Sequence, residues 1–191
     1  AQDSTAISVE KVIEEAMAES IGLEIDRSAL LGLGGLEPRG VIQTEGILTE
    51  DLANNPIESY DFLSRANTKL LNANEKPTAL IAPSQMFGDL DLLKDKDENP
   101  MKPCPSYAGE GPNRPSYQKL SSNQLEDSAV LADWGKLLIG FRTEIQLDVT
   151  DKVSDAFERL EVWLRAFIRI DCGIKREHAF CHIKNYGEVA S

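Results

Sequence analysis

The segment 160–174 (LEVWLRAFIRIDCGI) constrains the fold of this chain more than any other stretch. Every second residue in it is apolar, at Leu160, Val162, Leu164, Ala166, Ile168, Ile170, Cys172 and Ile174. A period of two is typical of a β-strand with one buried face. A helix fits less well, because Val162, Ala166 and Ile170 lie outside the helical stripe. The pattern therefore predicts one long strand that ends near Gly173.

The predicted strand is long for a chain of this size. Its 15 residues would extend about 50 Å, whereas a compact domain of 191 residues has a radius of gyration of roughly 16 Å. Typical strands have about 5–6 residues, so two strands joined by a bend are the alternative. A continuous strand would instead require a flat, elongated molecule.

A second long element precedes this strand in the chain. Helical spacing within residues 8–31 is carried by Val9, Val12, Ile13, Ala16, Met17 and Ile21. Ser8 is a candidate N-cap, and Gly32 ends the predicted helix. A long helix near one end and a long strand near the other predict an α+β protein with a mixed region inserted between them.

The remaining segments predict shorter elements. Helical spacing within residues 51–71 falls on Ile57, Tyr60, Leu63, Ala66 and Leu70. We further expect a buried strand at 77–83, a short helix at 85–93, a loop at 94–122, strands at 129–141 and 143–150, and a closing strand at 178–183. Because long loops are usually functional or mobile, the loop is a candidate site.

The charge and cysteine content exclude several classes of protein. A net charge of −12 disfavours general nucleic-acid binding, because phosphates would be repelled. The chain has three cysteines, an odd number, and they are widely spaced at Cys104, Cys172 and Cys181. This argues against a disulfide framework and for a reducing compartment. No apolar run reaches the roughly 18 residues of a membrane span, so we expect no membrane partner. No signal peptide is visible and the first residue is not Met, so we expect a processed or truncated chain.

No motif predicts catalysis. The glycines of 32–35 (GLGG) partly resemble a dinucleotide-binding cluster, but they follow a helix, which favours a helix stop and a turn. A zinc site and buried thiols with surface histidines are alternatives for Cys172, His178, Cys181 and His182. The carboxylates of residues 89–98 predict a solvated acidic loop, with cation binding as the alternative. We predict no catalytic residue, no cofactor and no metal.

The second face of the predicted strand carries aromatic and arginine side chains. Residues of these types are enriched in protein interfaces. We predict a subunit interface formed by Arg159, Trp163, Arg165, Phe167 and Arg169. The alternative is a half-exposed face with arginines lying along it, or a face covered by the long helix.

The order of motifs along nearly the whole chain resembles the major capsid proteins of tailed bacteriophages, which have the Hong Kong 97 fold. That family's Gly-x-Gly turn after a helix, followed by Pro-x-Gly, is matched by Gly32, Gly34, Pro38 and Gly40. Further matches are the strand region with Trp134, Gly135 and Arg142, the arginine-bearing long strand with Arg165 and Arg169, and the closing pair Ala179 and Phe180.

The resemblance implies a Hong Kong 97-type α+β fold with two domains. A peripheral domain, built from the spine helix and the long strand, would comprise residues 1–39 and 145–176. An axial domain would comprise residues 40–144 and 177–191. The family's N-terminal arm and extended loop have no counterpart here, so the sequence would be the later two-thirds of such a protein.

The implied function is structural and not enzymatic. Such a chain would be the major capsid subunit of a tailed phage or prophage, forming pentamers and hexamers with copies of itself in an icosahedral shell. DNA would be a partner only by enclosure. Assembly would occur in the bacterial host cytoplasm, the final location would be the virion capsid, and an isolated fragment would be a monomer or small oligomer. The alternatives are an encapsulin-type nanocompartment shell and a small acidic α/β enzyme with its site in residues 94–122.

Overall fold

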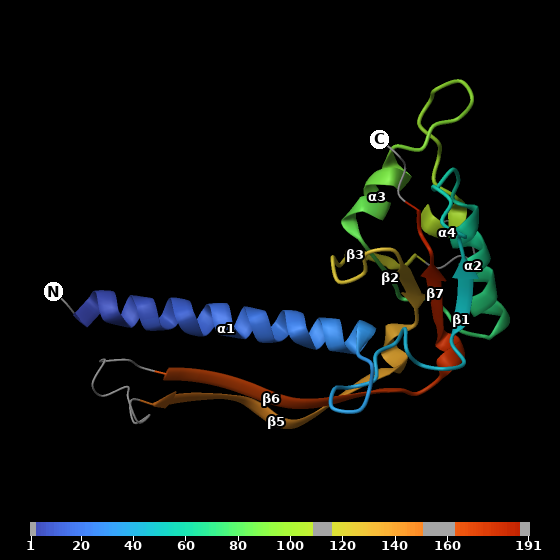
Figure 1. Ribbon diagram of the computed structural model, residues 1–191. Coiled ribbons are helices and arrows are strands. Elements are labelled where there is room, and N and C mark those ends of the chain that lie inside the picture. The colour runs from blue at the N-terminus through green and yellow to red at the C-terminus, as the bar shows by residue number, and fades with distance from the viewer. Residues whose placement is uncertain (1–2, 109–115, 151–162, 188–191) are drawn as a thin grey trace. The chain divides into compact units, whose positions relative to one another are not determined.

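The computed structural model describes residues 3–108, 116–150 and 163–187 (Figure 1). The chain forms two compact units. Unit 1 comprises Ala1–Gly40 and Ile139–Gly173, and unit 2 comprises Val41–Leu138 and Ile174–Ser191. The assignment of residues to a peripheral and an axial domain stays a prediction.

Unit 1 contains a long helix and most of a two-stranded sheet. The helix α1 spans Asp3–Leu31, and the sheet pairs β5 (Leu137–Thr150) with β6 (Trp163–Ile174). The helix starts earlier than predicted, so the assignment of Ser8 as its N-cap was wrong. No glycine or proline interrupts residues 3–8, and nothing in that stretch therefore stops the helix from extending.

The long strand is confirmed as one continuous element over the 12 residues of β6. Residues 160–162 of the predicted strand lie outside the described residues. The strands expected at 129–141 and 143–150 were divided wrongly, because β4 (Ala129–Ala132) ends before the 3-10 turn Trp134–Lys136 and β5 then runs unbroken. The break falls at Asp133, whose side chain accepts a hydrogen bond from the Gly135 amide at 3.2 Å.

Unit 2 is built on a five-stranded mixed sheet in the order β1-β7-β4-β2-β3. The remaining strands are β1 (Leu48–Asp51), β2 (Ala79–Ala82), β3 (Gln118–Ser121) and β7 (Phe180–Lys184). Antiparallel pairing joins β4 to β2 and to β7, whereas β1–β7 and β2–β3 are parallel. The helices are α2 (Asp61–Asn72), α3 (Ser84–Asp91) and α4 (Pro105–Ala108), with a 3-10 turn at Glu177–Ala179.

The expected loop at 94–122 was wrong in part, because it contains α4 and β3. All four residues of β3 are exposed, and the strand pairs with β2 on one side. Pairing with β2, and not an apolar pattern, makes this segment a strand. A sequence pattern that depends on burial cannot reveal such an edge strand.

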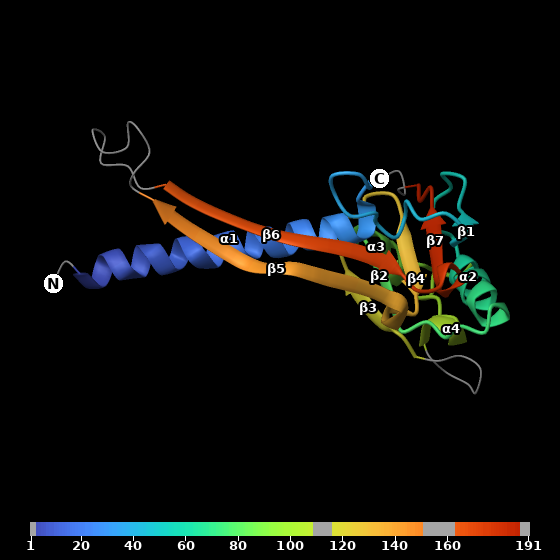
Figure 2. The same ribbon diagram turned by 90° about the horizontal axis from the view of Figure 1, so that it is seen from below.

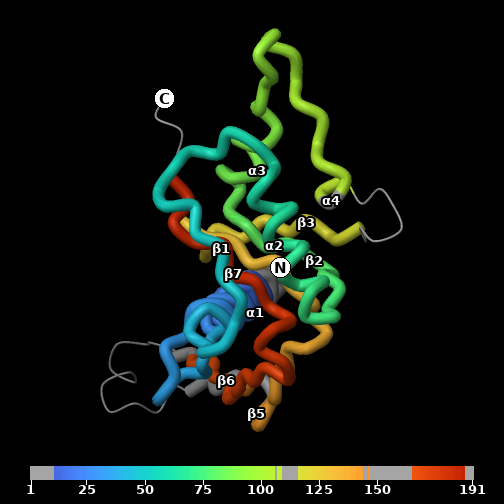
Figure 3. The backbone as a smooth tube through the Cα atoms, turned by 90° about the vertical axis from the view of Figure 1, so that its right-hand side faces the viewer, coloured from blue at the N-terminus to red at the C-terminus, as the bar shows by residue number. Residues whose placement is uncertain are grey.

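The core of unit 2 lies between the sheet and α2. The five apolar positions predicted for this helical region (Ile57, Tyr60, Leu63, Ala66 and Leu70) are all buried in one cluster. The central strand β4 is buried at every residue. Figures 1 and 3 show α2 lying beside β1.

The environment of His182 in the sheet leads us to expect that unit 2 is less stable at acidic pH. His182 lies on β7 between Thr49 of β1 and Val130 of β4, and its Nε2 is buried without a hydrogen-bond partner among the described residues. Burial, and then the nearby Lys184 charge, lower the pKa of His182 below its ordinary value of 6.5, against a smaller opposite effect of Asp127. The folded state therefore disfavours the protonated form that the unfolded chain adopts.

We expect the free energy of unfolding to fall as the pH drops through the unfolded-state pKa of about 6.5, by at most about 1.4 kcal/mol per pH unit. Urea unfolding at about pH 7.5 and about pH 5.5 measures this. His182→Gln should lose less stability between the two pH values than the parent protein does. An equal loss in both proteins would contradict the prediction.

Candidate assembly surface

The turn that follows α1 explains the glycines matched in the sequence. Its amide–carbonyl bonds run from Gly32 N to Ser28 O at 3.0 Å and from Gly40 N to Gly32 O at 2.8 Å. Gly34 and Gly35 have φ angles of 82° and 87°, in the left-handed region that favours glycine. The cluster is a helix stop followed by a closed turn, as predicted, and not the start of a helix.

An ion-pair network holds this turn to the end of α1. Arg27 Nη2 lies 2.6 Å from Glu24 Oε1 and 2.6 Å from Glu37 Oε2. Glu37 also accepts a 2.8 Å hydrogen bond from the Leu33 amide, which, together with Arg27, lowers the pKa of Glu37. The network is solvent-accessible, so it positions the turn more than it stabilises the unit.

The register of the β5–β6 hairpin sorts its side chains onto two faces. Lys175 N donates to Lys136 O at 2.9 Å, which places these residues opposite each other in an antiparallel pair. Counting along both strands places Gly140 opposite Asp171, in agreement with the 3.8 Å between a Cβ built on Gly140 and the Asp171 carbonyl oxygen. Side chains directly opposite one another share a face.

The two faces differ in chemistry. We call arginine face the one that carries Gly140, Arg142, Arg165, Phe167, Arg169 and Asp171. We call apolar face the opposite one, which carries the apolar residues Ile139, Phe141, Ala166, Ile168, Ile170 and Cys172 and one hydroxyl side chain, Thr143. The sequence pattern predicted that the apolar side of the long strand is buried. This was wrong for its described part, because the β6 residues of the apolar face are only half-buried.

The β6 residues beside α1 belong to both faces of the hairpin, Phe167, Arg169 and Asp171 to the arginine face and Ala166, Ile168 and Ile170 to the apolar face. A groove of about 750 Å³ lies between α1, the turn and the hairpin, and its lining includes Ile21, Glu24 and Ile25 of the helix. The β5 residues that line the groove, Gly140 and Arg142, both belong to the arginine face. Figures 1 and 2 show α1 and the hairpin running alongside one another.

The predicted interface residues are therefore divided. Phe167 and Arg169 line the groove, and Arg165 is exposed with its guanidinium 4.8 Å from the centre of the Phe167 ring. Trp163 begins β6, and Arg159 lies outside the described residues. The structure brings Arg165, Phe167 and Arg169 onto one face, and their role as an interface stays a prediction.

Unit 1 exposes apolar side chains, among them Val12 of the helical pattern predicted from the sequence. On the hairpin, Phe141 is 62% exposed and Ile139 is 40% exposed. On α1, Val12 is 60% exposed and Leu23 is 54% exposed. At 100° per residue, these two helix positions lie on the side of α1 opposite to Ile21 and Ile25, so apolar residues occur on both sides of α1, beside charged residues such as Glu14 and Glu19. No pattern in the sequence separates a face covered by the chain itself from one left open.

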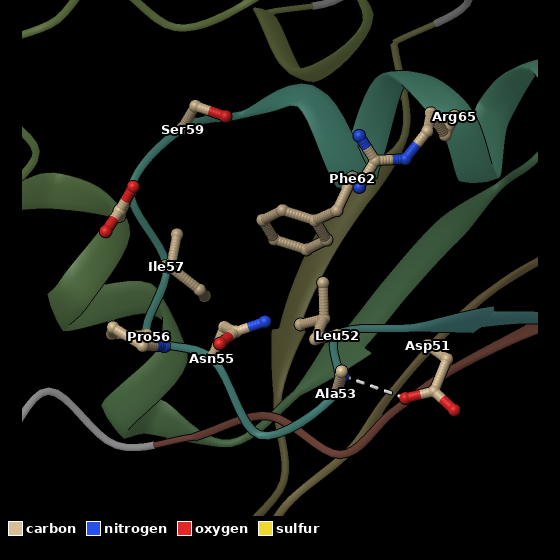
Figure 4. A pocket seen from close by; sticks show the side chains of 10 residues that line it. Asp51, Leu52, Ala53, Asn55, Pro56, Ile57, Ser59, Phe62 and Arg65 are labelled. Atoms are coloured by element: carbon tan, nitrogen blue, oxygen red, sulfur yellow. Dashed lines mark hydrogen bonds between the residues drawn. The ribbon is translucent and has the colours of Figure 1, made fainter.

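Two pockets of unit 2, both lined by described residues, hold no catalytic arrangement. A pocket of about 400 Å³ lies between the end of β1 and the start of α2, where Leu52 and Phe62 project into it (Figure 4). Two of the three charged residues in its lining are paired within the protein, Arg65 with Glu50 and Asp51 with Lys184, and the third is the exposed Glu58. A second groove, of about 1030 Å³, runs along β2 and β3, and no histidine, cysteine or carboxylate lines it.

The candidate metal and membrane features receive no support from the described residues. In residues 3–108, 116–150 and 163–187, no three histidine, cysteine or acidic side chains gather as metal ligands. His178 belongs to the 3-10 turn before β7, so the closing strand begins at Phe180 and not at residue 178 as predicted. Over the same residues, no helix combines the length and apolar character needed to cross a bilayer.

A buried carboxylate joins β1 to α2 behind the smaller pocket. Glu50 is buried, and its two oxygens lie 2.5 Å from Arg65 Nε and 2.6 Å from Lys69 Nζ. Burial alone would raise the pKa of Glu50, but the hydrogen bonds from Lys69 and Arg65 hold it below the ordinary value of 4.5. The ion pair therefore stabilises unit 2 above that pH.

We expect Glu50→Gln to destabilise unit 2 by about 1–2 kcal/mol at neutral pH, because both cations lose a charged acceptor. Urea unfolding measures the change, and the exposed pocket residue Glu58 provides the matched control Glu58→Gln, which should cost less than about 0.5 kcal/mol. Because the folded-state pKa is lowered, the Glu50 contribution is lost as the pH falls through 4.5. A Glu50→Gln deficit that persists undiminished at about pH 3 would contradict this account.

Comparison with known proteins assigns the chain to a family. The sequence profile of the Phage capsid family matches residues 1–185. The chain belongs to the phage capsid family. A comparison with curated protein sequences finds no match. The resemblance inferred from the order of the glycine turn, the long strand and the closing Ala179–Phe180 pair is thus confirmed.

Solved structures share the capsid fold at low sequence identity. The chain superposes with a TM-score of 0.70 and 16% identity on "Capsid of empty GTA particle computed with C5 symmetry", covering 94% of this chain and 66% of that one. For Mycobacterium phage Bobi the TM-score is 0.69 at 16% identity, covering 91% of this chain and 64% of that one. The virus-like particle from Pyrococcus furiosus gives 0.58 at 16% identity, covering 83% and 62%. The chain thus spans slightly less than two thirds of these proteins.

These likenesses confirm the predicted α+β fold of the Hong Kong 97 type. Membership of the phage capsid family points to a structural protein and not to an enzyme. In that context the closed glycine turn and the long hairpin are features of a shell-forming fold, and neither forms a reaction centre. The surfaces left open on unit 1 become the candidates for contacts between copies.

Proposed function

We propose that this chain is a structural major capsid subunit of a tailed phage or prophage, which assembles with copies of itself into an icosahedral shell. Pentamers and hexamers would form the shell, and DNA would be held only by enclosure. Assembly would take place in the bacterial host cytoplasm, and the virion capsid would be the final location. The family match over residues 1–185 carries the proposal.

The helix of unit 1 supports self-association. A helix that is apolar on one side only needs one partner, whereas α1 has Ile21 and Ile25 toward the groove and Val12 and Leu23 on the other side. An exposed apolar surface on both a helix and a hairpin is costly in water and marks contact surfaces. We retain Arg159, Trp163, Arg165, Phe167 and Arg169 as proposed contacts, since arginine and aromatic residues are enriched at such interfaces.

The alternatives have less support. An encapsulin-type shell shares the fold, but the virus-like particle from Pyrococcus furiosus matches with a lower TM-score than the GTA capsid. An enzyme with its site in 94–122 would need convergent acid and base groups. The groove beside Tyr117 and Gln118 of that segment is lined by one lysine and a tyrosine whose pKa is raised by burial, with no base near them in the lining.

Sedimentation velocity and electron microscopy of the 191-residue chain at rising concentration test the proposal. We expect the mass to increase with concentration and to give rings of five or six copies, sheets or closed shells. A monomer up to about 100 µM would contradict it, because contacts that build a shell operate at micromolar concentration.

A further inference from the structure

We propose that residues 184–187, which end β7 and follow it, act as a latch that fixes the turn at residues 51–55 and the helix α3 of unit 2. The turn has a backbone conformation that its own sequence does not favour, and contacts from the latch hold it there. The inference concerns unit 2 alone, and it stands whether or not copies of the chain associate.

The turn and the latch place three residues other than glycine in the left-handed region. The φ angles are 54° at Ala53, 57° at Asn54 and 56° at Asn185. Asparagine tolerates this region, whereas alanine adopts it only at a cost in free energy. Such a backbone persists only where the surrounding structure holds it. The contacts made by this turn should therefore include those that impose its conformation.

The latch supplies such contacts through its backbone and through one side chain. The Asn54 amide donates a hydrogen bond to the Asn185 carbonyl oxygen at 3.0 Å. The Asn185 side-chain amide donates to Asp51 Oδ1 at 2.7 Å, and the same oxygen accepts from the Ala53 amide at 2.8 Å (Figure 4). One carboxylate oxygen thus joins the latch to the alanine whose conformation is unfavourable.

The last described residue of the latch fits closely against the turn. A Cβ built on Gly187 would collide with the Asn54 carbonyl oxygen and would lie 2.7 Å from the Asn54 carbonyl carbon. These atoms belong to the backbone, so they cannot rotate away as a flexible side chain can. A glycine therefore allows the chain to pass this close to the turn.

Tyr186 joins the latch to a second element. Of the four latch residues it alone is buried, and its hydroxyl donates a hydrogen bond to Asp89 of α3. Asp89 is also buried and accepts a 3.3 Å hydrogen bond from Gln85 Nε2. The Tyr186 amide donates to the Asp127 carbonyl oxygen at 2.8 Å, in the segment before β4. Tyr186 is thus the buried anchor of the latch.

The two sets of contacts are adjacent in the chain, so they should open together. Residues 53–55 are exposed, and hydrogen bonds and one close backbone approach join the turn to the latch. Segments with few buried apolar contacts open locally while the core stays folded. Loss of the Tyr186 anchor should therefore free the turn, although the Tyr186 hydroxyl contacts α3. Residues 51–53 and Asn55 line the smaller pocket, so the same opening would change its shape.

Hydrogen exchange of the 191-residue chain, followed by mass spectrometry, tests this coupling. Tyr186→Phe removes one hydroxyl group, and Gly187→Ala places a methyl group against the backbone of the turn. In both variants we expect the amides of residues 53–55 to exchange at least about tenfold faster than in the parent protein. The amides of β4 should exchange at the parent rate, because this strand lies in the centre of the sheet.

Tyr60→Phe is the matched control. The Tyr60 hydroxyl also donates to α3, at 2.8 Å to the Leu90 carbonyl oxygen, and Tyr60 is as buried as Tyr186. Tyr60 lies outside the latch, so its variant should leave exchange at residues 53–55 at the parent rate. Circular dichroism checks that each variant folds, and if Gly187→Ala does not, Tyr186→Phe decides the test.

Three results would overturn the proposal. The first is exchange at residues 53–55 that stays at the parent rate in a folded latch variant. The second is exchange in β4 that accelerates as much as in the turn, because this would indicate a general loss of stability in place of a local opening. The third is an equal acceleration at residues 53–55 in Tyr60→Phe.

Discussion

Replacement of Leu131 by alanine is expected to lower the free energy of unfolding of unit 2 by about 2–5 kcal/mol. Leu131 is fully buried in the central strand β4, where it lies between Leu80 of β2 and Cys181 of β7. The change removes apolar contacts and leaves a cavity that the paired strands on both sides cannot fill by moving. Urea unfolding followed by circular dichroism and tryptophan fluorescence measures the loss.

Leu120→Ala is the matched control for this prediction. Leu120 belongs to the same sheet, but it lies on the edge strand β3 and is 45% exposed. We expect its replacement to change stability by less than about 0.5 kcal/mol. Similar effects of the two substitutions would mean that β4 is not the centre of the core.

Gly40→Ala is expected to destabilise the turn after α1 by about 3 kcal/mol, the upper part of the range for overpacking. A Cβ at this position would lie 2.5 Å from the Gly32 nitrogen and 2.6 Å from the Leu30 carbonyl oxygen. These are backbone atoms held by the end of α1, so they cannot turn aside as a flexible side chain can. Thermal unfolding followed by helical circular dichroism measures the change.

Gly22→Ala, a substitution within α1 itself, should have the opposite effect on stability. Apart from its chain neighbours and the backbone of its own helix, no atom lies within 4 Å of a Cβ built on Gly22, and its backbone is helical. Removing the flexibility of glycine should therefore stabilise α1 by about 0.5–1 kcal/mol. If Gly40→Ala melts at the temperature of the parent protein, the turn is not closely packed and its link to the family motif fails.

Much of the architecture could be read from local patterns. Alternation predicted β6, and helical spacing predicted the buried positions Leu63, Ala66 and Leu70 of α2, whereas Ile57 and Tyr60 of the same pattern are buried in the segment before the helix. The glycine turn was also predictable, because positive φ and close backbone approach both require glycine. Each of these features depends on residues that are near one another in the chain.

The errors arose where a distant partner decides the structure. The edge strand β3 exists because β2 lies beside it, and its own exposed residues carry no strand pattern. The start of α1 at Asp3 and the unbroken β5 differ from prediction because short polar stretches do not mark a boundary by themselves. The pairing of Glu50 with Arg65 and Lys69 was not expected either, since the carboxylate and the cations are separated in sequence by a loop and a helix turn.

The sequence by itself determined that residues 163–174 form a strand with one apolar and one arginine-bearing face, because side chains alternate along any extended backbone. Only the tertiary structure decided which residues of these faces lie beside α1. The groove beside α1 takes its lining from both faces of β6, with Phe167 and Arg169 on one face and Ile168 and Ile170 on the other, while Phe141 and Ile139 of β5 remain exposed. Burial requires two surfaces in contact, and the sequence of a strand does not specify which other surface covers it.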